Sequence, residues 1–260
     1  MSDVQIHPTA IVDPQAKLAA GVQIGPYSVI GEHVEIGPDT VIGAHVVIDG
    51  HTRLGARNKV FPWAVIGTEP KDLKYQGGAT RVEIGDGNSI REFALIEAGT
   101  ESGGWVTRIG NNCMVMANVH VGHDCDIADN VIMANNTLLA GHVRIESNAV
   151  LGGMCGVHQF VRIGQYSMVG GGSYIVMDVP PFCMVAGNRA RTHGLNLVGL
   201  ERQGFSERDV TQIKSAYKKI FRSKLTYQTA RDDLLGSSNV NPQVQYLINF
   251  LDKSERGFTR

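Results

Sequence analysis

An aliphatic side chain recurs at every sixth position along most of this 260-residue chain. Eleven successive hexads run from residue 6 to 66, three more from 84 to 96 and twelve from 109 to 175. Many of the aliphatic residues are followed by glycine. A period of six does not match the spacing of three and four that an amphipathic helix requires. It predicts a parallel β-helix of short strands and tight corners.

The aliphatic side chains of such a solenoid point into a narrow core, and three hexads complete one triangular coil. The repeat is interrupted at 68–81 and at 98–108, where we expect loops to project from the coil. Loops inserted into a solenoid commonly lie on its binding face. We therefore expect a mainly β fold in which residues 1–190 form the β-helix.

A different kind of structure is expected after the last hexad. The Asp-Val-Pro-Pro sequence at 178–181 would interrupt a strand or a helix. Ser206 followed by Asp209 is typical of a helix N-terminus. The apolar stripe after it consists of Val210, Ile213, Tyr217, Ile220 and Phe221. With further helices predicted at 226–235 and 241–253, residues 191–260 form a C-terminal α-helical domain that covers the open end of the solenoid.

The composition excludes several classes of function. A net charge of −1 gives no general attraction to nucleic acid or to a membrane surface. No apolar run approaches the roughly 18 residues of a membrane span, and the N-terminus lacks the pattern of a signal peptide. We therefore expect a cytoplasmic protein without an integral membrane segment. The four cysteines form no CxxC pair and are expected to be small, reduced, apolar residues.

Four of the nine histidines fall close together in the repeat, namely His120, His123, His142 and His158. Residues one coil apart lie above one another at roughly 4.8 Å, so Asp124 is expected to stack on His142. None of the four histidines takes an inward position of a hexad. A cluster of this kind fits either general-base chemistry near neutral pH or a metal site.

Several stretches, in order along almost the whole chain, resemble one family. They are residues 72–75, 80–86, 118–125, 134–136, 140–143, 152–154, 157–160, 178–181 and 204–206. The family is that of the UDP-N-acetylglucosamine O-acyltransferases, which open lipid A synthesis. Because the stretches include a loop, the histidine cluster and the tail, the resemblance is far more specific than the hexads, which alone would indicate only some acyl- or acetyltransferase.

The resemblance implies a left-handed β-helix and a homotrimer with active sites in clefts between neighbouring subunits. It implies that an (R)-3-hydroxyacyl group moves from acyl carrier protein to the 3-hydroxyl of UDP-N-acetylglucosamine. No metal and no other cofactor is implied.

The resemblance also implies roles for single residues. His123 would remove the proton of the sugar hydroxyl, Asp124 would hold the imidazole, and the backbone N–H of Gly141 would stabilise the thioester oxygen. Contacts to the sugar, the phosphates and the acyl chain are assigned to Asp72, Lys74, His120, His142, His158 and Gln159. Those at the nucleotide end are assigned to Asn196 and Arg202.

Gly171 matches the position that sets the acyl length in this family. A glycine leaves room for a longer chain than a bulky residue would, so we expect a longer 3-hydroxyacyl donor. The carrier protein of this reaction is acidic. Basic residues of the tail, Lys214, Lys218, Lys219 and Arg222, are therefore candidates for carrier docking, with three of them on one face at a spacing of four. A solvated helix face explains the same charges.

The chain departs from the family pattern at three places. Glu97-Ala98 stands where the family commonly has His-Arg, Val198 where it commonly has glutamate, and Gln203 where it commonly has a second arginine. Two lost cations and one gained acid should weaken the binding of a diphosphate. Glu97 would also suit a cationic acceptor, so that the substrate is the 3-amino analogue of the sugar and the product an amide.

Other readings remain open at the level of the sequence. The N-acyltransferase of the same pathway typically has a domain before its hexads, whereas here the hexads begin at Ile6. A coenzyme A-dependent acetyltransferase would leave the loop at 72–75 unexplained. A zinc hydratase would need two histidines five apart, whereas His120 and His123 are three apart. A trimeric scaffold would not need the histidine cluster.

Overall fold

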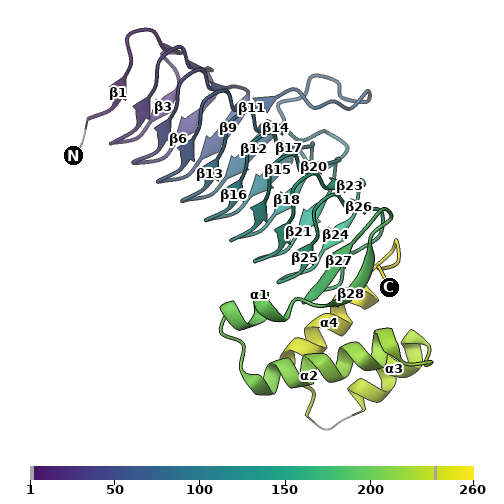
Figure 1. The fold of residues 1–260 in the computed structure, drawn as a ribbon. Coiled ribbons are helices and arrows are strands. Elements are labelled where there is room, and N and C mark those ends of the chain that lie inside the picture. The colour runs from purple at the N-terminus through teal and green to yellow at the C-terminus, as the bar shows by residue number, and fades with distance from the viewer. Residues whose placement is uncertain (1–2, 237–238) are drawn as a thin grey trace.

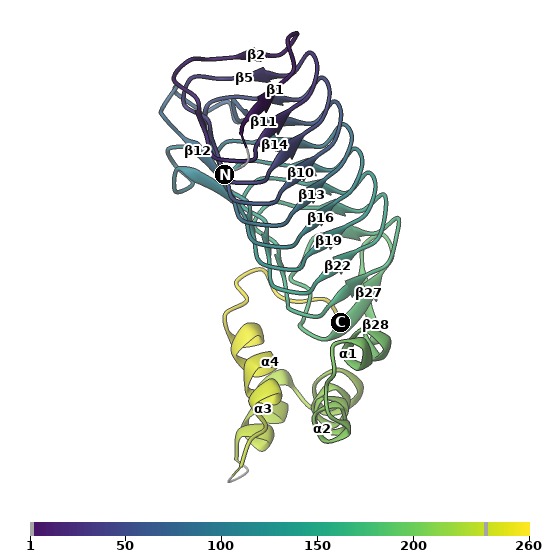
Figure 2. The same ribbon diagram turned by 90° about the vertical axis from the view of Figure 1, so that its left-hand side faces the viewer.

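The computed structural model describes residues 3–236 and 239–260. Each hexad forms one short strand, and the strands stack into three sheets that form the sides of a long prism (Figure 1). A small group of helices lies at the C-terminal end of the prism (Figure 2). The predicted left-handed β-helix with a C-terminal helical part is confirmed.

We name the three sheets A, B and C. Sheet A contains β1 (Gln5–Ile6), β4 (Gln23–Ile24), β7 (Val41–Ile42), β10 (Lys59–Val60), β13 (Ser89–Ile90), β16 (Met114–Val115), β19 (Ile132–Met133), β22 (Val150–Leu151), β25 (Met168–Val169), β27 (Cys183–Ala186) and β28 (Arg191–Leu195). Sheet B contains β2 (Ile11–Val12), β5 (Val29–Ile30), β8 (Val47–Ile48), β11 (Val65–Thr68), β14 (Leu95–Glu97), β17 (His120–Val121), β20 (Leu138–Leu139), β23 (Gly156–Val157) and β26 (Tyr174–Ile175). Sheet C contains β3 (Lys17–Leu18), β6 (Glu35–Ile36), β9 (His51–Leu54), β12 (Arg81–Ile84), β15 (Val106–Ile109), β18 (Asp126–Ile127), β21 (Arg144–Ile145) and β24 (Arg162–Ile163).

The aliphatic residues of the hexads form one continuous core along the prism. Each strand pairs with the strand one coil away in the same register, so that Ile127 lies beside Ile145 and Ile145 beside Ile163. From Ile24 onward these inward side chains are almost entirely buried. Burial of a side chain of this size stabilises the fold by about 1.5–3 kcal/mol, which explains why the hexad dictates the architecture.

Two loops leave the corner between sheet B and sheet C, at 69–80 and at 98–105. The prediction that the second loop extends to residue 108 is wrong. Residues 106–108 belong to β15, which pairs with β12 over four residues and places Thr107 beside Val82 in the core. Both loops come from the same corner of successive coils, so they lie beside each other (Figure 1).

The tail consists of α1 (Leu197–Arg202), α2 (Glu207–Tyr217), η1 (Lys218–Arg222), α3 (Tyr227–Leu235) and α4 (Pro242–Asp252). The Ser206 hydroxyl accepts the N–H of Asp209 at 3.1 Å, so the predicted start of this helix is confirmed. The helices enclose a second core with Phe182 of the last coil. Arg162 of β24 donates to the carbonyl oxygens of Phe250 and Lys253, which fastens the tail to the β-helix.

We predict that the β-helix ends at residue 190, and this domain boundary stays a prediction. Sheet A continues past that residue through β28. Among the described residues, no helix combines the length and the apolar character needed to cross a bilayer.

Candidate active site

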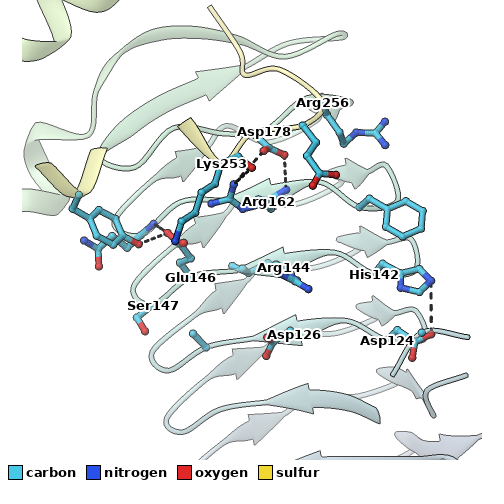
Figure 3. A pocket seen from close by; sticks show the side chains of 17 residues that line it. Asp124, Asp126, His142, Arg144, Glu146, Ser147, Arg162, Asp178, Lys253 and Arg256 are labelled. Atoms are coloured by element: carbon cyan, nitrogen blue, oxygen red, sulfur yellow. Dashed lines mark hydrogen bonds and ion pairs between the residues drawn. The ribbon is translucent and has the colours of Figure 1, made fainter. Parts of the chain in front are cut away.

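The corner between sheet B and sheet C presents three aligned side chains in successive coils. Asp124, His142 and Phe160 occupy equivalent positions with left-handed backbone conformations, at φ of 58°, 62° and 63°. Asp and His tolerate this conformation better than most residues, and it turns their side chains outward at the edge of the prism. The rings of His142 and Phe160 stack with centroids 4.4 Å apart. The predicted stacking of Asp124 and His142 places Oδ2 of Asp124 3.8 Å from Nε2 of His142 (Figure 3).

His123 and Asp124 form a hydrogen-bonded pair. The Nδ1 atom of His123 lies 2.8 Å from Oδ2 of Asp124, and the side chain of Asp124 is fully buried. Because an ionised carboxylate only accepts hydrogen bonds, the neutral imidazole carries its proton on Nδ1 and leaves Nε2 free to accept one. The pair therefore has the arrangement of an oriented general base.

The hydrogen bond to Asp124 is the main cause that raises the pKa of His123 above its ordinary value, while burial acts against it. Asp72 and Glu97 raise the same pKa through their charges. Burial lowers the pKa of His142 instead. Asp124 is itself buried, which raises its pKa, but hydrogen bonds from His123 and Thr100 outweigh burial and keep the carboxyl ionised. The two neighbouring imidazoles therefore have opposite tendencies, and His123 is the more basic.

Gly141 lies directly against the imidazole of His123. A Cβ atom at this position would come within 2.5 Å of Nε2, so only glycine fits without displacing the ring. In the described part of the chain, no acceptor is bound to the N–H of Gly141. A free backbone N–H close to a base can stabilise the oxyanion of a carbonyl group that the activated nucleophile attacks.

A cleft of about 730 Å³ opens over this pair. It is lined by Lys71, Asp72, Leu73, Lys74, Ser102, Gly103, His123, His142, Gln159 and Phe160. A second cleft of about 890 Å³ shares Gly103, His142 and Phe160 with the first. It continues along the outer face of sheet C to the tail (Figure 3). Five of the predicted site residues thus line one cleft, because the loop at 69–80 folds over the histidine corner.

Neither His120 nor His158 lines the cleft, but His120 shares Glu97 with Lys71 and His158 precedes Gln159, both of which line it. His120 projects from β17, and its Nε2 lies 3.1 Å from the Glu97 carboxylate. Glu97 is 1% exposed and also pairs with Lys71 at 2.9 Å. Burial acts to raise the pKa of Glu97, but the bonds from His120 and Lys71 prevail and lower it to about 2. Glu97 is therefore a buried anion whose charge is balanced by residues of this chain.

His158 is contacted by a residue of the C-terminal tail. Arg256 places a guanidinium nitrogen 3.2 Å from Nδ1 of His158, and the same Nδ1 lies 3.2 Å from the carbonyl oxygen of Gln159. The sequence provided no signal for Arg256, since it lies outside the repeat, nor for Lys71, whose role depends on the fold of its loop.

Three predicted residues lie elsewhere in the chain. Gly171 is on the corner between sheet A and sheet B, where a Cβ would lie 3.2 Å from the carbonyl oxygen of Gly153. Asn196 caps α1 by accepting the N–H of Gly199, and Arg202 is in the last turn of the same helix. None of the three lines either cleft of a single chain.

The basic residues of the tail do not form the predicted single face. α2 ends at Tyr217 and the π-helix η1 follows, so Arg222 is not one α-helical turn beyond Lys218. The Arg222 guanidinium instead donates to the Tyr217 hydroxyl and to the carbonyl oxygen of His193. The prediction of one face is therefore wrong at Arg222, because the wider turn directs that side chain toward β28.

The remaining lysines of this group differ in their surroundings. Lys219 forms an ion pair with Asp233 at 3.2 Å. The side chains of Lys214 and Lys218 are exposed and bind no other side chain among residues 3–236 and 239–260. Only these two are free for a partner.

One group of side chains has the composition of a metal site. The ligand atoms of His123, Asp124 and His142 all lie within 4.8 Å of one another. However, Oδ2 of Asp124 already binds His123 and accepts the Thr100 hydroxyl at 2.6 Å. A metal bound to this oxygen would have to replace the hydrogen bonds to His123 and Thr100. The three side chains are therefore arranged as a hydrogen-bonded base.

Family profiles match both parts of the chain. The profile of bacterial hexapeptide-repeat transferases matches residues 3–38, 16–50 and 107–141. The profile described as domain 2 of UDP-N-acetylglucosamine O-acyltransferase matches residues 178–259. Fold and sequence therefore define an acyltransferase of the hexapeptide-repeat class.

The similar proteins identify the family within this class. The chain is 48% identical to the acyl-(acyl-carrier-protein) UDP-N-acetylglucosamine O-acyltransferase of Myxococcus xanthus, over 98% of this chain and 99% of that protein. It is 49% identical to the enzyme of the same name from Thiobacillus denitrificans, with the same coverage. The crystal structure of UDP-N-acetylglucosamine O-acyltransferase from Moraxella catarrhalis superimposes with a TM-score of 0.95 at 44% identity, over 98% of this chain and 99% of that chain. The chain belongs to the UDP-N-acetylglucosamine O-acyltransferase family.

The opposite pKa shifts of the two imidazoles are measurable. In an NMR titration, His123 should titrate above the ordinary histidine value of about 6.5 and His142 below it. In Asp124→Asn the pKa of His123 should fall, because the neutral amide no longer favours the protonated ring. His123 titrating below His142 in the unmodified protein would contradict the arrangement.

Proposed function

We propose that this protein transfers an (R)-3-hydroxyacyl group from acyl carrier protein to the 3-hydroxyl of UDP-N-acetylglucosamine. This is the first step of lipid A biosynthesis. The observation that carries the mechanism is the oriented imidazole of His123, which lines the cleft and lies directly against Gly141. We also propose that the reaction takes place in the cytoplasm.

In the mechanism, the sugar hydroxyl binds at Nε2 of His123 and attacks the carbonyl carbon of the thioester. His123 takes the hydroxyl proton as the C–O bond forms, and Asp124 stabilises the resulting imidazolium. The N–H of Gly141 stabilises the negative charge on the thioester oxygen. When the C–S bond breaks, the imidazolium returns the proton to the leaving thiolate of the carrier. No metal or other cofactor takes part in these steps.

Asp72, Lys74, His142 and Gln159 line the cleft, and we propose that they bind the sugar, the phosphates and the acyl group. His120 and His158 lie next to this group of residues and are proposed to extend the same contacts.

The proposal is tested with 3-hydroxyacyl carrier proteins of graded chain length and UDP-N-acetylglucosamine, with the products identified by mass. We expect an ester of a longer acyl chain, because Gly171, at the position that sets acyl length in the family, has no side chain to block the groove. His123→Ala should lower kcat by about 10²–10⁴-fold, the usual contribution of a general base. An unchanged rate in His123→Ala would overturn the mechanism, and activity only with short donors would overturn the role of Gly171.

Assembly into a homotrimer is part of the proposal. The outward residues of sheet C are charged along its whole length and begin with an alternation of Lys17, Glu35 and Arg53. Sheets A and B expose apolar side chains instead, among them Ile132 at 37% and Leu138 at 52%. Exposed apolar surface of this extent usually marks an interface. Face A of one copy packed against face B of the next gives a closed ring of three when each copy is rotated by one third of a turn.

The edge between sheets A and B supports the same assembly. Tyr27, His45, Trp63 and Phe93 stack along it, with the rings of His45 and Trp63 4.1 Å apart. Trp63 is 50% exposed in the single chain. We propose that this aromatic edge faces the symmetry axis. Asn196 and Arg202, which line neither of the two clefts described above, then belong to the nucleotide end of a neighbouring subunit's site.

The assembly has two consequences that can be measured. Native mass spectrometry should give three times the 28.1 kDa chain, and Trp63→Glu should dissociate the trimer whereas Arg53→Glu on the charged face should not. The variants His123→Ala and Arg202→Ala should each be impaired alone. Trimers assembled from a mixture of the two variant chains should recover part of the activity, because one of their three sites then contains neither substitution. Failure of mixed trimers to recover would contradict a shared site.

Carrier docking is proposed at the two unpaired lysines, Lys214 and Lys218, rather than at all four basic residues. Their double substitution by glutamate should raise the KM for the carrier-linked donor several-fold, and the KM for the sugar should not change, because the acidic carrier is then repelled. The matched control is Lys17→Glu, at the opposite end of the prism (Figure 1). An unchanged KM in the double variant would exclude this docking surface.

The 3-amino sugar remains a second candidate acceptor, and the observation that favours it is the Glu97–His120 bond. If Nε2 of His120 donates to Glu97, its Nδ1 is left as an acceptor. An acceptor there suits an amine, which keeps an N–H to donate. Acylation of both sugars in the same assay decides between them, and a strong preference for the hydroxyl would exclude the amine.

A further inference from the structure

The carboxylate of Asp124 is held by the second loop as well as by His123. The Thr100 hydroxyl donates to Oδ2 at 2.6 Å, and the Thr100 N–H donates to Oδ1 at 2.9 Å. Thr100 is 1% exposed. From the other side, the N–H of Asp124 donates to the Thr107 hydroxyl at 2.8 Å. Thr100 therefore binds both carboxylate oxygens where the chain enters the loop, and Thr107 binds the Asp124 backbone just after the loop ends.

The loop closes tightly over the carboxylate. A Cβ atom at Gly103 would lie 2.1 Å from the carboxylate carbon of Asp124, so this residue packs directly against it. The next residue after Thr100, Glu101, accepts the N–H groups of Gln76 and Gly78. The segment that fixes Asp124 is thus also bound to the loop at 69–80, which carries Asp72 and Lys74.

We propose that Thr100 is a positioning residue for the transfer reaction: its hydroxyl orients the Asp124 carboxylate, which in turn orients the imidazole of His123. This inference rests on the proposed role of His123 as the base. Oδ2 accepts two hydrogen bonds, from Thr100 and from His123, and the first fixes the direction of the second. The Thr100 hydroxyl keeps its proton throughout the reaction and does not touch the reacting atoms.

The variant that tests this is Thr100→Val, which keeps the shape and the N–H of the residue but loses the hydroxyl. We expect kcat to fall about tenfold, part of the usual contribution of an oriented base, while both KM values stay within about twofold. The acidic limb of the pH profile should move to higher pH. A carboxylate that loses a donor becomes more basic and holds the proton on His123 more strongly.

The pH shift is specific because the other charged groups around His123 are unchanged. They are Asp72, Lys71 and Lys74 of the first loop, Glu97 of β14 and His142 of the next coil. Thr100→Ser restores the hydroxyl and should restore both the rate and the profile. As a matched control, Thr52→Val removes another buried hydroxyl far from Asp124. Val82 occupies the equivalent position in the next coil, so a valine fits there, and we expect the rate and the pH profile to stay unchanged.

The outcomes separate this inference from the function on which it rests. Full activity in His123→Ala would overturn the proposed mechanism itself. Loss of activity in His123→Ala combined with wild-type kcat and pH profile in Thr100→Val would overturn the role of Thr100 alone. Equal losses in Thr100→Val and Thr100→Ser, with an unchanged profile, would show that the residue only supports the fold of the loop.

Discussion

The stacking of coils in fixed register is the constraint on which the rest of the structure depends. Each residue lies directly beside its counterpart one coil away, as Ile127 does beside Ile145. A side chain at a corner therefore meets the side chains of the same corner above and below it. The candidate active site is such a corner, where Asp124, His142 and Phe160 follow one another. The hydrophobic core thus fixes the geometry of the site, although no residue of that core lines the cleft over His123.

The loops add what a regular solenoid cannot supply. Stacked corners expose their side chains to water, and an exposed carboxylate would interact only weakly with an imidazole. The loop at 98–105 covers Asp124 and satisfies both of its oxygens, so that the carboxylate stays ionised although its side chain is fully buried. The loop that interrupts the hexads therefore keeps a buried, ionised carboxylate beside the imidazole of His123.

The sequence predicted most of the architecture because the hexads report on one repeated local event, the burial of an aliphatic side chain. It predicted the contact of Asp124 with His142 for the same reason. It was wrong where no repeat exists: residues 106–108 are strand, and the π-helix after Tyr217 turns Arg222 away from the expected basic face. The partners Lys71, Thr100 and Arg256 depend on how irregular segments fold, which periodicity does not encode.

The substitution at Glu97 illustrates how such segments change the chemistry of a site. From the sequence, an acid near a diphosphate should repel it. In the structure the carboxylate is buried against Lys71 and His120, and a buried carboxylate without such partners would cost several kcal/mol. Lys71 therefore compensates Glu97, while Ala98 adds no cation. On the proposed function, the weaker diphosphate binding expected from the sequence would then follow from the missing cations more than from repulsion by Glu97, because the charge of Glu97 is balanced within the chain.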